Sequence, residues 1–245
     1  MPAIVLHLKE DDVARDLKGW HLRLYPVLRR MAQEAGIDMQ IRVRDGDIKI
    51  GTRRVTDARF DDGNLHIIDD RSVCAPNVLN AGVAYFWEFW HLDPSGVKAF
   101  SSIAQRSFDP GQIPFRRAKP FFEMLRARHV EKRHSKYAQP EATTAFAPGA
   151  LSVFFQGNYP VASGATTFSD LDMLRSVLRH AGDRPVIAKP HPLVSAPEDI
   201  AAARALAQSD SRLTVTEANV HDILTASAAT VSINSTVSLE GFLHR

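Results

Sequence analysis

The sequence predicts an α/β protein of two domains, the second of which is built on a parallel β-sheet, and two observations support this prediction. Short apolar segments alternate with segments of helical periodicity between residues 150 and 245, which is typical of strand–helix units around a parallel sheet. The chain has 245 residues, of which 44% are hydrophobic and 24% charged, as in soluble globular proteins with one large or two compact domains. No apolar run approaches the ~20 residues of a membrane span, and the single cysteine, Cys74, is typical of a reducing cytoplasm. We therefore expect a cytoplasmic protein.

The first half has the pattern of an α/β region with some hairpin character. A buried strand is expected where a short apolar segment precedes acidic residues, and a helix where leucines recur at helical spacing before Gly36. Asp-Gly pairs indicate two turns between further strand-like segments. The expected strands are Ala3–Leu8, Met39–Val43, Ile48–Ile50 and Leu65–Ile68, the expected helix is Trp20–Ala35, and the turns are Asp45-Gly46 and Asp62-Gly63.

The second half is more regular and follows a stretch typical of a linker, Ala138–Gly149. This linker predicts an N-terminal α/β domain over residues 1–140 and a doubly wound domain over residues 150–245. The chain stops about ten residues into its last expected helix, so we expect the second domain to be incomplete at its C-terminus and the chain to be a fragment. The expected strands are Leu151–Gln156, Pro185–Ala188, Leu213–Thr216 and Ala229–Ile233, and the expected helices are Ser169–Ala181, Pro197–Gln208, Asn219–Ala226 and a last one from Ser235.

The net charge of +2 is too small to indicate nucleic acid binding, but the charge is unevenly distributed. Residues 115–136 hold eight Lys or Arg against two Glu, a net charge of +6. A basic helix of this kind contacts anionic lipid or another polyanion, or it is a solvated helix whose Phe121, Phe122 and Leu125 face inward. Its basic face lacks the interleaved aromatic residues of an RNA-binding surface, so no nucleic acid partner is expected.

Polar residues of the second half follow predicted strands, and ligands of parallel sheets bind beyond such strand ends. Two prolines restrict His191 within Lys189-Pro190-His191-Pro192, which suits either a phosphate oxygen or a rigid turn. Asn234-Ser235-Thr236 begins a helix, and it either caps that helix or binds an anion through its N–H groups. Gln156 at a buried strand end needs a hydrogen-bond partner, and Glu240 either reaches a ribose hydroxyl or lies in solvent.

In the first half, Glu88 lies at the centre of the densest aromatic run, Tyr85–His91. Aromatic rings desolvate a carboxylate, which suits a general acid or base, and the alternative is a strand with Glu88 or His91 exposed. Asp45-Gly46-Asp47 has the formal spacing that metal-dependent sugar transferases use, but a turn explains this sequence equally well. The sequence has no P-loop, dinucleotide-binding glycine motif or nucleophile elbow, and no spacing that supports a metal site.

The second half resembles the bacterial capsule polysaccharide biosynthesis glycosyltransferases, a group that includes the β-Kdo transferases. The resemblance covers residues 151–245, and in the first half only Glu88 resembles the family's acidic position. The family's aspartate shortly after the strand-end glutamine has no counterpart before Asp170. The residues that carry the resemblance are, in order, Gln156, Asp172-Met173-Leu174-Arg175, Lys189-Pro190-His191-Pro192 and Asn234-Ser235-Thr236-Val237-Ser238-Leu239-Glu240.

This resemblance implies a GT-B-like architecture of two Rossmann-like domains, the second truncated, and metal-independent sugar transfer from a nucleotide donor, with CMP-Kdo favoured. His191 and Ser235 would hold the donor phosphate, Glu240 would contact the ribose, and Glu88 would be catalytic. The other residues expected on the donor side are Gln156, Lys189, Asn234 and Thr236. No cofactor and no metal would be needed. The acceptor would be a glycan or lipid-linked glycan at the inner face of the cytoplasmic membrane, with residues 119–136 near anionic lipid.

Two other interpretations stay open. A sugar-nucleotide epimerase of the same architecture would need no acceptor and would release a rearranged sugar nucleotide. A catalytically silent glycan-binding or assembly subunit would bind without turnover, and the missing aspartate and the abrupt chain end both favour it.

Overall fold

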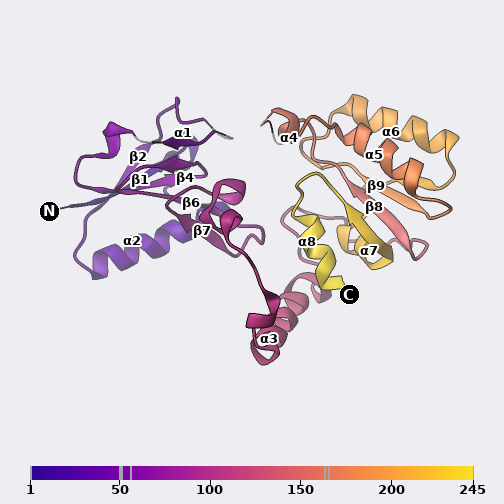
Figure 1. The fold of residues 1–245 in the computed structure, drawn as a ribbon, viewed down its shortest axis with the longest axis horizontal. Coiled ribbons are helices and arrows are strands. Elements are labelled where there is room, and N and C mark those ends of the chain that lie inside the picture. The colour runs from indigo at the N-terminus through magenta and orange to yellow at the C-terminus, as the bar shows by residue number, and fades with distance from the viewer. Residues whose placement is uncertain (1, 50–51, 56, 163, 165, 245) are drawn as a thin grey trace. The chain divides into compact units, whose positions relative to one another are not determined.

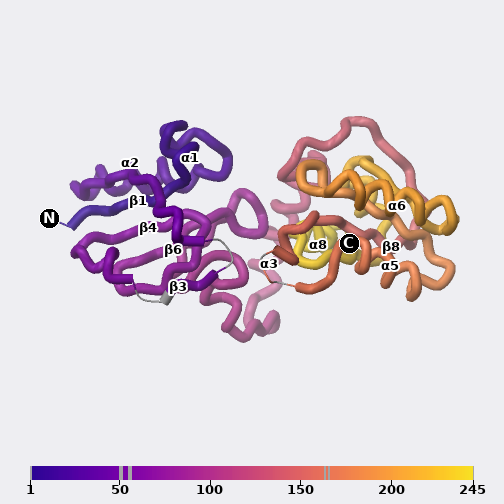
Figure 2. The backbone as a smooth tube through the Cα atoms, turned by 90° about the horizontal axis from the view of Figure 1, so that it is seen from above, coloured from indigo at the N-terminus to yellow at the C-terminus, as the bar shows by residue number. Residues whose placement is uncertain are grey.

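The computed structural model describes residues 2–49, 52–55, 57–162, 164 and 166–244, which form two compact units, residues 1–108 and 109–245 (Figure 1). Within the described residues, the first unit has a five-stranded main sheet and the second a four-stranded sheet. Figure 2 traces the same chain path by colour, from indigo at the N-terminus to yellow at the C-terminus. The predicted α/β architecture with parallel sheets is confirmed.

The N-terminal sheet has the strand order β2-β1-β4-β6-β7. All neighbours are parallel except β6 and β7, and two short strands, β3 and β5, pair separately. Its strands are β1 (Ile4–Leu8), β2 (Met39–Val43), β3 (Arg54–Val55), β4 (Leu65–Asp69), β5 (Val73–Cys74), β6 (Val78–Val83) and β7 (Trp90–Asp93), and its helices are α1 (Glu10–Ala14) and α2 (Leu24–Glu34), with 3₁₀ turns at Trp20–Leu22, Ala58–Phe60, Lys98–Phe100 and Ser102–Gln105.

The two faces of this sheet are covered differently. On one face Leu6 and Leu8 of β1 pack against Tyr25 of α2, while on the other Ile68 packs with Phe60, which lies in a 3₁₀ turn. Successive residues of a strand point to opposite faces, so strands buried on both faces are apolar almost throughout. This accounts for the apolar residues of β1 at every position except His7.

The expected hairpin character is wrong for both Asp-Gly turns, because Asp45-Gly46 and Asp62-Gly63 lie in connections between parallel strands. The antiparallel pair is β6–β7 instead. The expected strand Ile48–Ile50 is also wrong at its described residues: Ile48 lies in a bend with its side chain in the core, and Ile50 is outside the described residues. A buried apolar side chain needs no strand hydrogen bonds, so the apolar character of Ile48 predicts its burial but not its pairing in a strand.

Two buried histidines join β1 to β4. His66 Nε2 lies 2.8 Å from Asp62 Oδ1, and His7 Nε2 lies 2.9 Å from His66 Nδ1. Because the carboxylate accepts from His66 Nε2, His66 Nδ1 is the acceptor for the N–H of His7. Burial, and then the charge of His66, lower the pKa of His7 from 6.5 to about 4.

This shift predicts an acid-sensitive N-terminal unit. The stabilisation from neutral His7 is complete above the unfolded pKa of 6.5 and is lost as the pH falls towards 4, by up to about 3 kcal/mol. We expect the free energy of unfolding in urea to fall over this range. The fall should be smaller in His7→Gln, whose amide can still donate to His66. Equal acid dependence of the two proteins would contradict the assignment.

The C-terminal sheet is entirely parallel and has the strand order β10-β9-β8-β11. In order along the chain this is 3-2-1-4, the arrangement of a doubly wound nucleotide-binding half. Its strands are β8 (Ala150–Phe154), β9 (Val186–Lys189), β10 (Leu213–Val215) and β11 (Ser227–Val231), and the unit's helices are α3 (Phe115–Arg126), α4 (Tyr159–Ala162), α5 (Asp170–His180), α6 (Pro197–Ser209), α7 (Val220–Ala226) and α8 (Val237–Gly241), with a π turn at Ala127–Glu131 and 3₁₀ turns at Pro110–Gln112 and Phe242–His244.

Helices cover both faces of this sheet (Figure 1). On one face Leu174 of α5 and Ala203 of α6 pack with Val153. On the other, Ile223 of α7 packs with Phe154. Every expected strand and helix of this half is present, but β11 begins two residues earlier than expected and the last helix begins at Val237.

Residues 109–149 group with the C-terminal unit, so the predicted linker Ala138–Gly149 lies within that unit. The contacts are specific: Asp222 accepts hydrogen bonds from Arg133 and from the Thr144 N–H, and Asn219 donates to the Pro140 carbonyl at 2.9 Å. An irregular stretch with two prolines is typical of a linker by composition, but its backbone groups here find partners on α7. Composition alone does not reveal such partners.

As a solvated helix, the basic helix α3 was expected to turn Phe121, Phe122 and Leu125 toward the core, and only Leu125 does so. Leu125 is buried, but Phe121 and Phe122 are 50% and 38% exposed. No helix in the described ranges combines the length and the apolar character that crossing a bilayer requires.

Candidate functional site

The carboxyl ends of β8 and β11 meet at the topological switch point of the C-terminal sheet, because strand 1 and strand 4 are neighbours there. Val153 of β8 is paired with Val231 of β11. Gln156 and Asn234 each follow three residues later in the chain, just beyond the ends of these strands. Gln156 Oε1 accepts a hydrogen bond from the Asn234 N–H at 2.8 Å. Two predicted site residues are thus brought together, and the partner that Gln156 was expected to need is protein backbone.

Asp170, the first residue of α5, binds the backbone of the turn that follows β8. Its Oδ2 accepts from the N–H groups of Gln156 at 2.9 Å and Gly157 at 2.7 Å. Burial raises the pKa of Asp170, and these two hydrogen bonds partly oppose the rise. Among the described residues, its buried Oδ1 has no hydrogen-bond partner.

The sequence marks Asp170 only as the first carboxylate after Gln156 and predicts no role for it. The signal available was the helix start at Ser169, where Ser169 and Asp172 form a capping box. That signal places the start of α5 but does not show that α5 begins beneath the end of β8.

His191 follows β9 at the same edge of the sheet. Phe154 is paired with Lys189, so Gln156 and His191 lie at equivalent positions beyond their strands. The Leu193 N–H donates to His191 Nδ1 at 3.1 Å, and Ser195 Oγ accepts from the His191 N–H at 2.8 Å. The ring also packs edge-on against Tyr137, with 4.9 Å between centroids.

This geometry determines the tautomer of His191. Because Nδ1 accepts from a backbone N–H, it carries no proton, and the hydrogen of the neutral ring is on Nε2. Burial, and then the charges of Lys136 and Lys189, lower the pKa of His191, so the ring is neutral near pH 7. His191 is therefore prepared to donate one hydrogen bond from Nε2.

The Lys189 ammonium is hydrogen-bonded within the protein. Its Nζ donates to the Glu217 carbonyl at 3.0 Å and to the Ala218 carbonyl at 2.7 Å, and burial lowers its pKa. These contacts tie the end of β9 to the connection that follows β10. In this structure Lys189 supports the edge on which His191 lies.

The segment before α8 carries the remaining donor-side residues. Ser235 Oγ accepts from the Val237 N–H at 3.3 Å, and Thr236 precedes α8 without a side-chain capping bond. Glu240 is buried, with 7% of its surface exposed, so its interpretation as a solvated helix charge is wrong.

Glu88 lies in the N-terminal unit, in the turn between β6 and β7. The alternative of a strand with alternating faces is wrong for residues 85–89, and Glu88 is half-buried. The neighbouring Trp87 ring lies beneath the Arg23 guanidinium, 5.9 Å from its centroid. Because β6 ends at Val83, this turn lies at the carboxyl end of β6.

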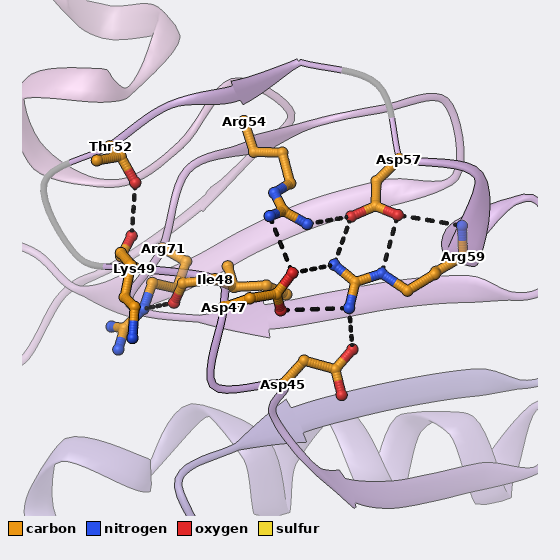
Figure 3. Close-up of polar contacts among 9 residues, drawn as sticks. All are labelled: Asp45, Asp47, Ile48, Lys49, Thr52, Arg54, Asp57, Arg59 and Arg71. Carbon is orange, nitrogen blue, oxygen red and sulfur yellow. Dashed lines mark hydrogen bonds and ion pairs between the residues drawn. The ribbon is translucent and has the colours of Figure 1, made fainter.

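The Asp-x-Asp sequence binds arginine in this structure (Figure 3). Arg59 donates to Asp45 at 2.7 Å and to both oxygens of Asp47, and Arg54 joins Asp47 to Asp57. The network connects the segment after β2 to the turns that precede β4. Among the described residues, no group of three His, Cys, Asp or Glu side chains is arranged to hold a metal ion.

Comparisons with known proteins agree with this architecture. Residues 125–245 match the family described as capsule polysaccharide biosynthesis protein. The fold is similar to that of Thermosulfurimonas dismutans KpsC, β-Kdo 2,4 transferase, with a TM-score of 0.55 and 12% identity over 99% of this chain and 77% of that chain. The 2,7 transferase of the same organism's KpsC gives a TM-score of 0.49 and 15% identity over 99% of this chain and 76% of that chain. No curated protein sequence matches the chain.

Proposed function

We propose that the protein is a glycosyltransferase of capsule or related surface polysaccharide assembly, because residues 125–245 match the family described as capsule polysaccharide biosynthesis protein. It transfers a sugar from a nucleotide donor to a glycan or glycolipid acceptor. The observation that carries the proposal is the switch point of the C-terminal sheet, where Gln156 binds the Asn234 backbone beside a neutral, oriented His191. Nucleotides bind at this position in doubly wound sheets.

In this proposal the donor phosphate lies at the carboxyl ends of β8, β9 and β11. His191 donates from Nε2 to a phosphate oxygen, the Ser235 hydroxyl donates to another, and Glu240 accepts from a ribose hydroxyl. Hydrogen bonds of this kind to an anion contribute more than neutral ones, and they need no metal. Gln156, Lys189, Asn234 and Thr236 keep the surrounding loops in place, and CMP-Kdo is the favoured donor.

On the acceptor side, Glu88 is the proposed acid–base group of the N-terminal unit. The proposed acceptor is a lipid-linked glycan at the inner face of the cytoplasmic membrane. Residues 119–136 are the proposed membrane contact, and the exposed rings of Phe121 and Phe122 next to basic side chains support it.

One observation favours the silent-subunit alternative. The carboxylate that binds the turn after β8, Asp170, is 3% exposed and accepts hydrogen bonds from backbone N–H groups, so it offers no open nucleophile. A silent subunit would bind a nucleotide or glycan without consuming the donor.

Calorimetry with CMP, UDP and GDP, without added metal, tests the proposal. Binding of one nucleotide, followed by transfer of its sugar to an acceptor, is the expected result. Selective UDP or GDP binding would remove Kdo from the proposal. Binding without turnover would favour the silent subunit, release of a rearranged sugar nucleotide would favour the epimerase, and absence of all nucleotide binding would overturn the proposed function.

A further inference from the structure

The turn that follows β8 contacts the connections on both sides of it, because β8 lies between β9 and β11 in the sheet. On the β11 side, Gln156 Oε1 accepts a hydrogen bond from the Asn234 N–H at 2.8 Å, one residue before Ser235. On the β9 side, Gly157 lies so close to the Val194 backbone that a Cβ on Gly157 would overlap the Val194 carbonyl oxygen. The position of this turn therefore constrains the segment before α8 and the segment after β9.

One carboxylate oxygen binds the backbone of this turn. Asp170 Oδ2 accepts from the N–H groups of Gln156 at 2.9 Å and Gly157 at 2.7 Å. These are the same two residues that make the contacts on either side. Asp170 belongs to α5, whose first turn is fixed by the capping box of Ser169 and Asp172. A helix therefore holds the acceptor, and the turn does not have to hold itself.

The surroundings of Asp170 oppose its charge. The residue is 3% exposed, and among the described residues its buried Oδ1 has no hydrogen-bond partner. Burial raises its pKa, the two backbone hydrogen bonds partly oppose the rise, and the charge of Asp199 in the first turn of α6 adds to it. A raised pKa means that the fold favours the neutral carboxyl, so the charge lowers the free energy of unfolding once the pH exceeds the folded-state pKa. Folding stability therefore does not explain the charge.

The charge strengthens the hold on the turn instead. Hydrogen bonds to an ionised oxygen are shorter and about twice as strong as those to a neutral one. A neutral amide in this position would accept the same two bonds more weakly. A ligand that needs one arrangement of the neighbouring segments binds with an affinity reduced to the fraction of molecules that have this arrangement. A carboxylate therefore favours binding at this edge of the sheet although it opposes folding.

We propose that Asp170 is a positioning residue of the donor site, and this inference rests on the proposed glycosyltransferase function. Through Gln156 it holds the segment that carries Ser235. Through Gly157 it holds the connection that carries His191. These are the two segments from which the donor phosphate receives hydrogen bonds in the proposed function. Asp170 itself touches neither the nucleotide nor the transferred sugar.

The coupling across the site is the first test, and it needs no ligand. Amide ¹H–¹⁵N spectra of the full chain at neutral pH report on Gln156, Gly157 and Asn234 separately. In Asp170→Asn the amide protons of Gln156 and Gly157 should move upfield, because a neutral oxygen is the weaker acceptor. The Asn234 signal should shift or broaden with them. An Asn234 signal that stays in place would overturn the proposal.

Nucleotide affinity and stability, measured on the same variant, are the second test. In Asp170→Asn we expect calorimetry with the preferred nucleotide to show a loss of about tenfold. The urea midpoint should not fall, because the substitution removes a charge that the fold disfavours. A purely structural residue would instead lose affinity and stability together.

Asp210→Asn is a matched control. Asp210 also accepts from a backbone N–H, that of Arg212 at 3.1 Å, but hydrogen bonds from the Arg212 side chain lower its pKa to about 2. It follows α6, which runs from the end of β9 to the start of β10, so it lies at the opposite edge of the sheet. We expect Asp210→Asn to leave the nucleotide affinity unchanged.

Three results would overturn the positioning role alone in a wild-type chain that binds nucleotide. They are unchanged affinity in Asp170→Asn, a loss of affinity that a lower urea midpoint accompanies, and an equal loss in Asp210→Asn. A wild-type chain that binds none of CMP, UDP and GDP would overturn the proposed function, and the positioning role with it.

Discussion

Replacing His191 with alanine should weaken nucleotide binding by roughly tenfold to a hundredfold. The expected loss is one hydrogen bond from His191 Nε2 to a phosphate oxygen, and bonds to charged groups contribute about 1.5–3 kcal/mol. Calorimetry with the preferred nucleotide measures the change directly. Because burial lowers the pKa of His191 and the Leu193 N–H occupies Nδ1, the affinity should not rise between pH 8 and pH 6.5.

His180→Ala is a matched control for this variant. His180 is the last residue of α5, and Nδ1 of its ring contacts the Ser176 carbonyl at 2.8 Å. Since α5 runs back from the end of β8 to the start of β9, its last residue lies at the opposite edge of the sheet. Unchanged affinity in His191→Ala, or an equal loss in both variants, would contradict the proposed donor site.

Replacing Gly157 with alanine should disrupt the same edge through the backbone. Gly157 has φ +63°, and a Cβ there would lie 2.2 Å from the Val194 carbonyl oxygen. A left-handed conformation costs a non-glycine residue about 1–2 kcal/mol, and the contact with Val194 cannot be relieved by a side-chain rotation. The connection 190–196 must therefore move, and with it the Leu193 N–H that orients His191.

Gly182 serves as a control that separates the conformational cost of a left-handed residue from the steric cost of the contact with Val194. Gly182 has φ +59°, and a Cβ there would meet nothing within 4 Å. Gly182→Ala should therefore lower the free energy of unfolding only by the cost of the left-handed conformation, and its nucleotide affinity should be unchanged. Gly157→Ala should unfold at a lower urea concentration than Gly182→Ala and should also bind nucleotide more weakly. Equal stability and affinity in the two variants would show that the turn after β8 tolerates a side chain.

The sequence predicted the C-terminal half almost completely. Its strands are short apolar runs and its helices begin at capping residues such as Ser169 and Asn219, so periodicity and local hydrogen bonding specify these elements. The sequence predicts the first half less completely, because Ile48 is buried in the core without belonging to a strand. Apolar character predicts burial, whereas strand pairing depends on which segments meet in the fold.

For the candidate site, the sequence alone determined which residues lie at the carboxyl ends of parallel strands, including Gln156, His191 and Asn234. Local sequence suffices for this, because a strand and the helix after it are each encoded within a few residues. Only the tertiary structure decided that Gln156 binds Asn234 and that Asp170 binds the turn after β8. The first contact spans 78 residues and forms because β8 and β11 are neighbours in the sheet, whereas the second spans 14 residues and depends on where α5 begins relative to the end of β8.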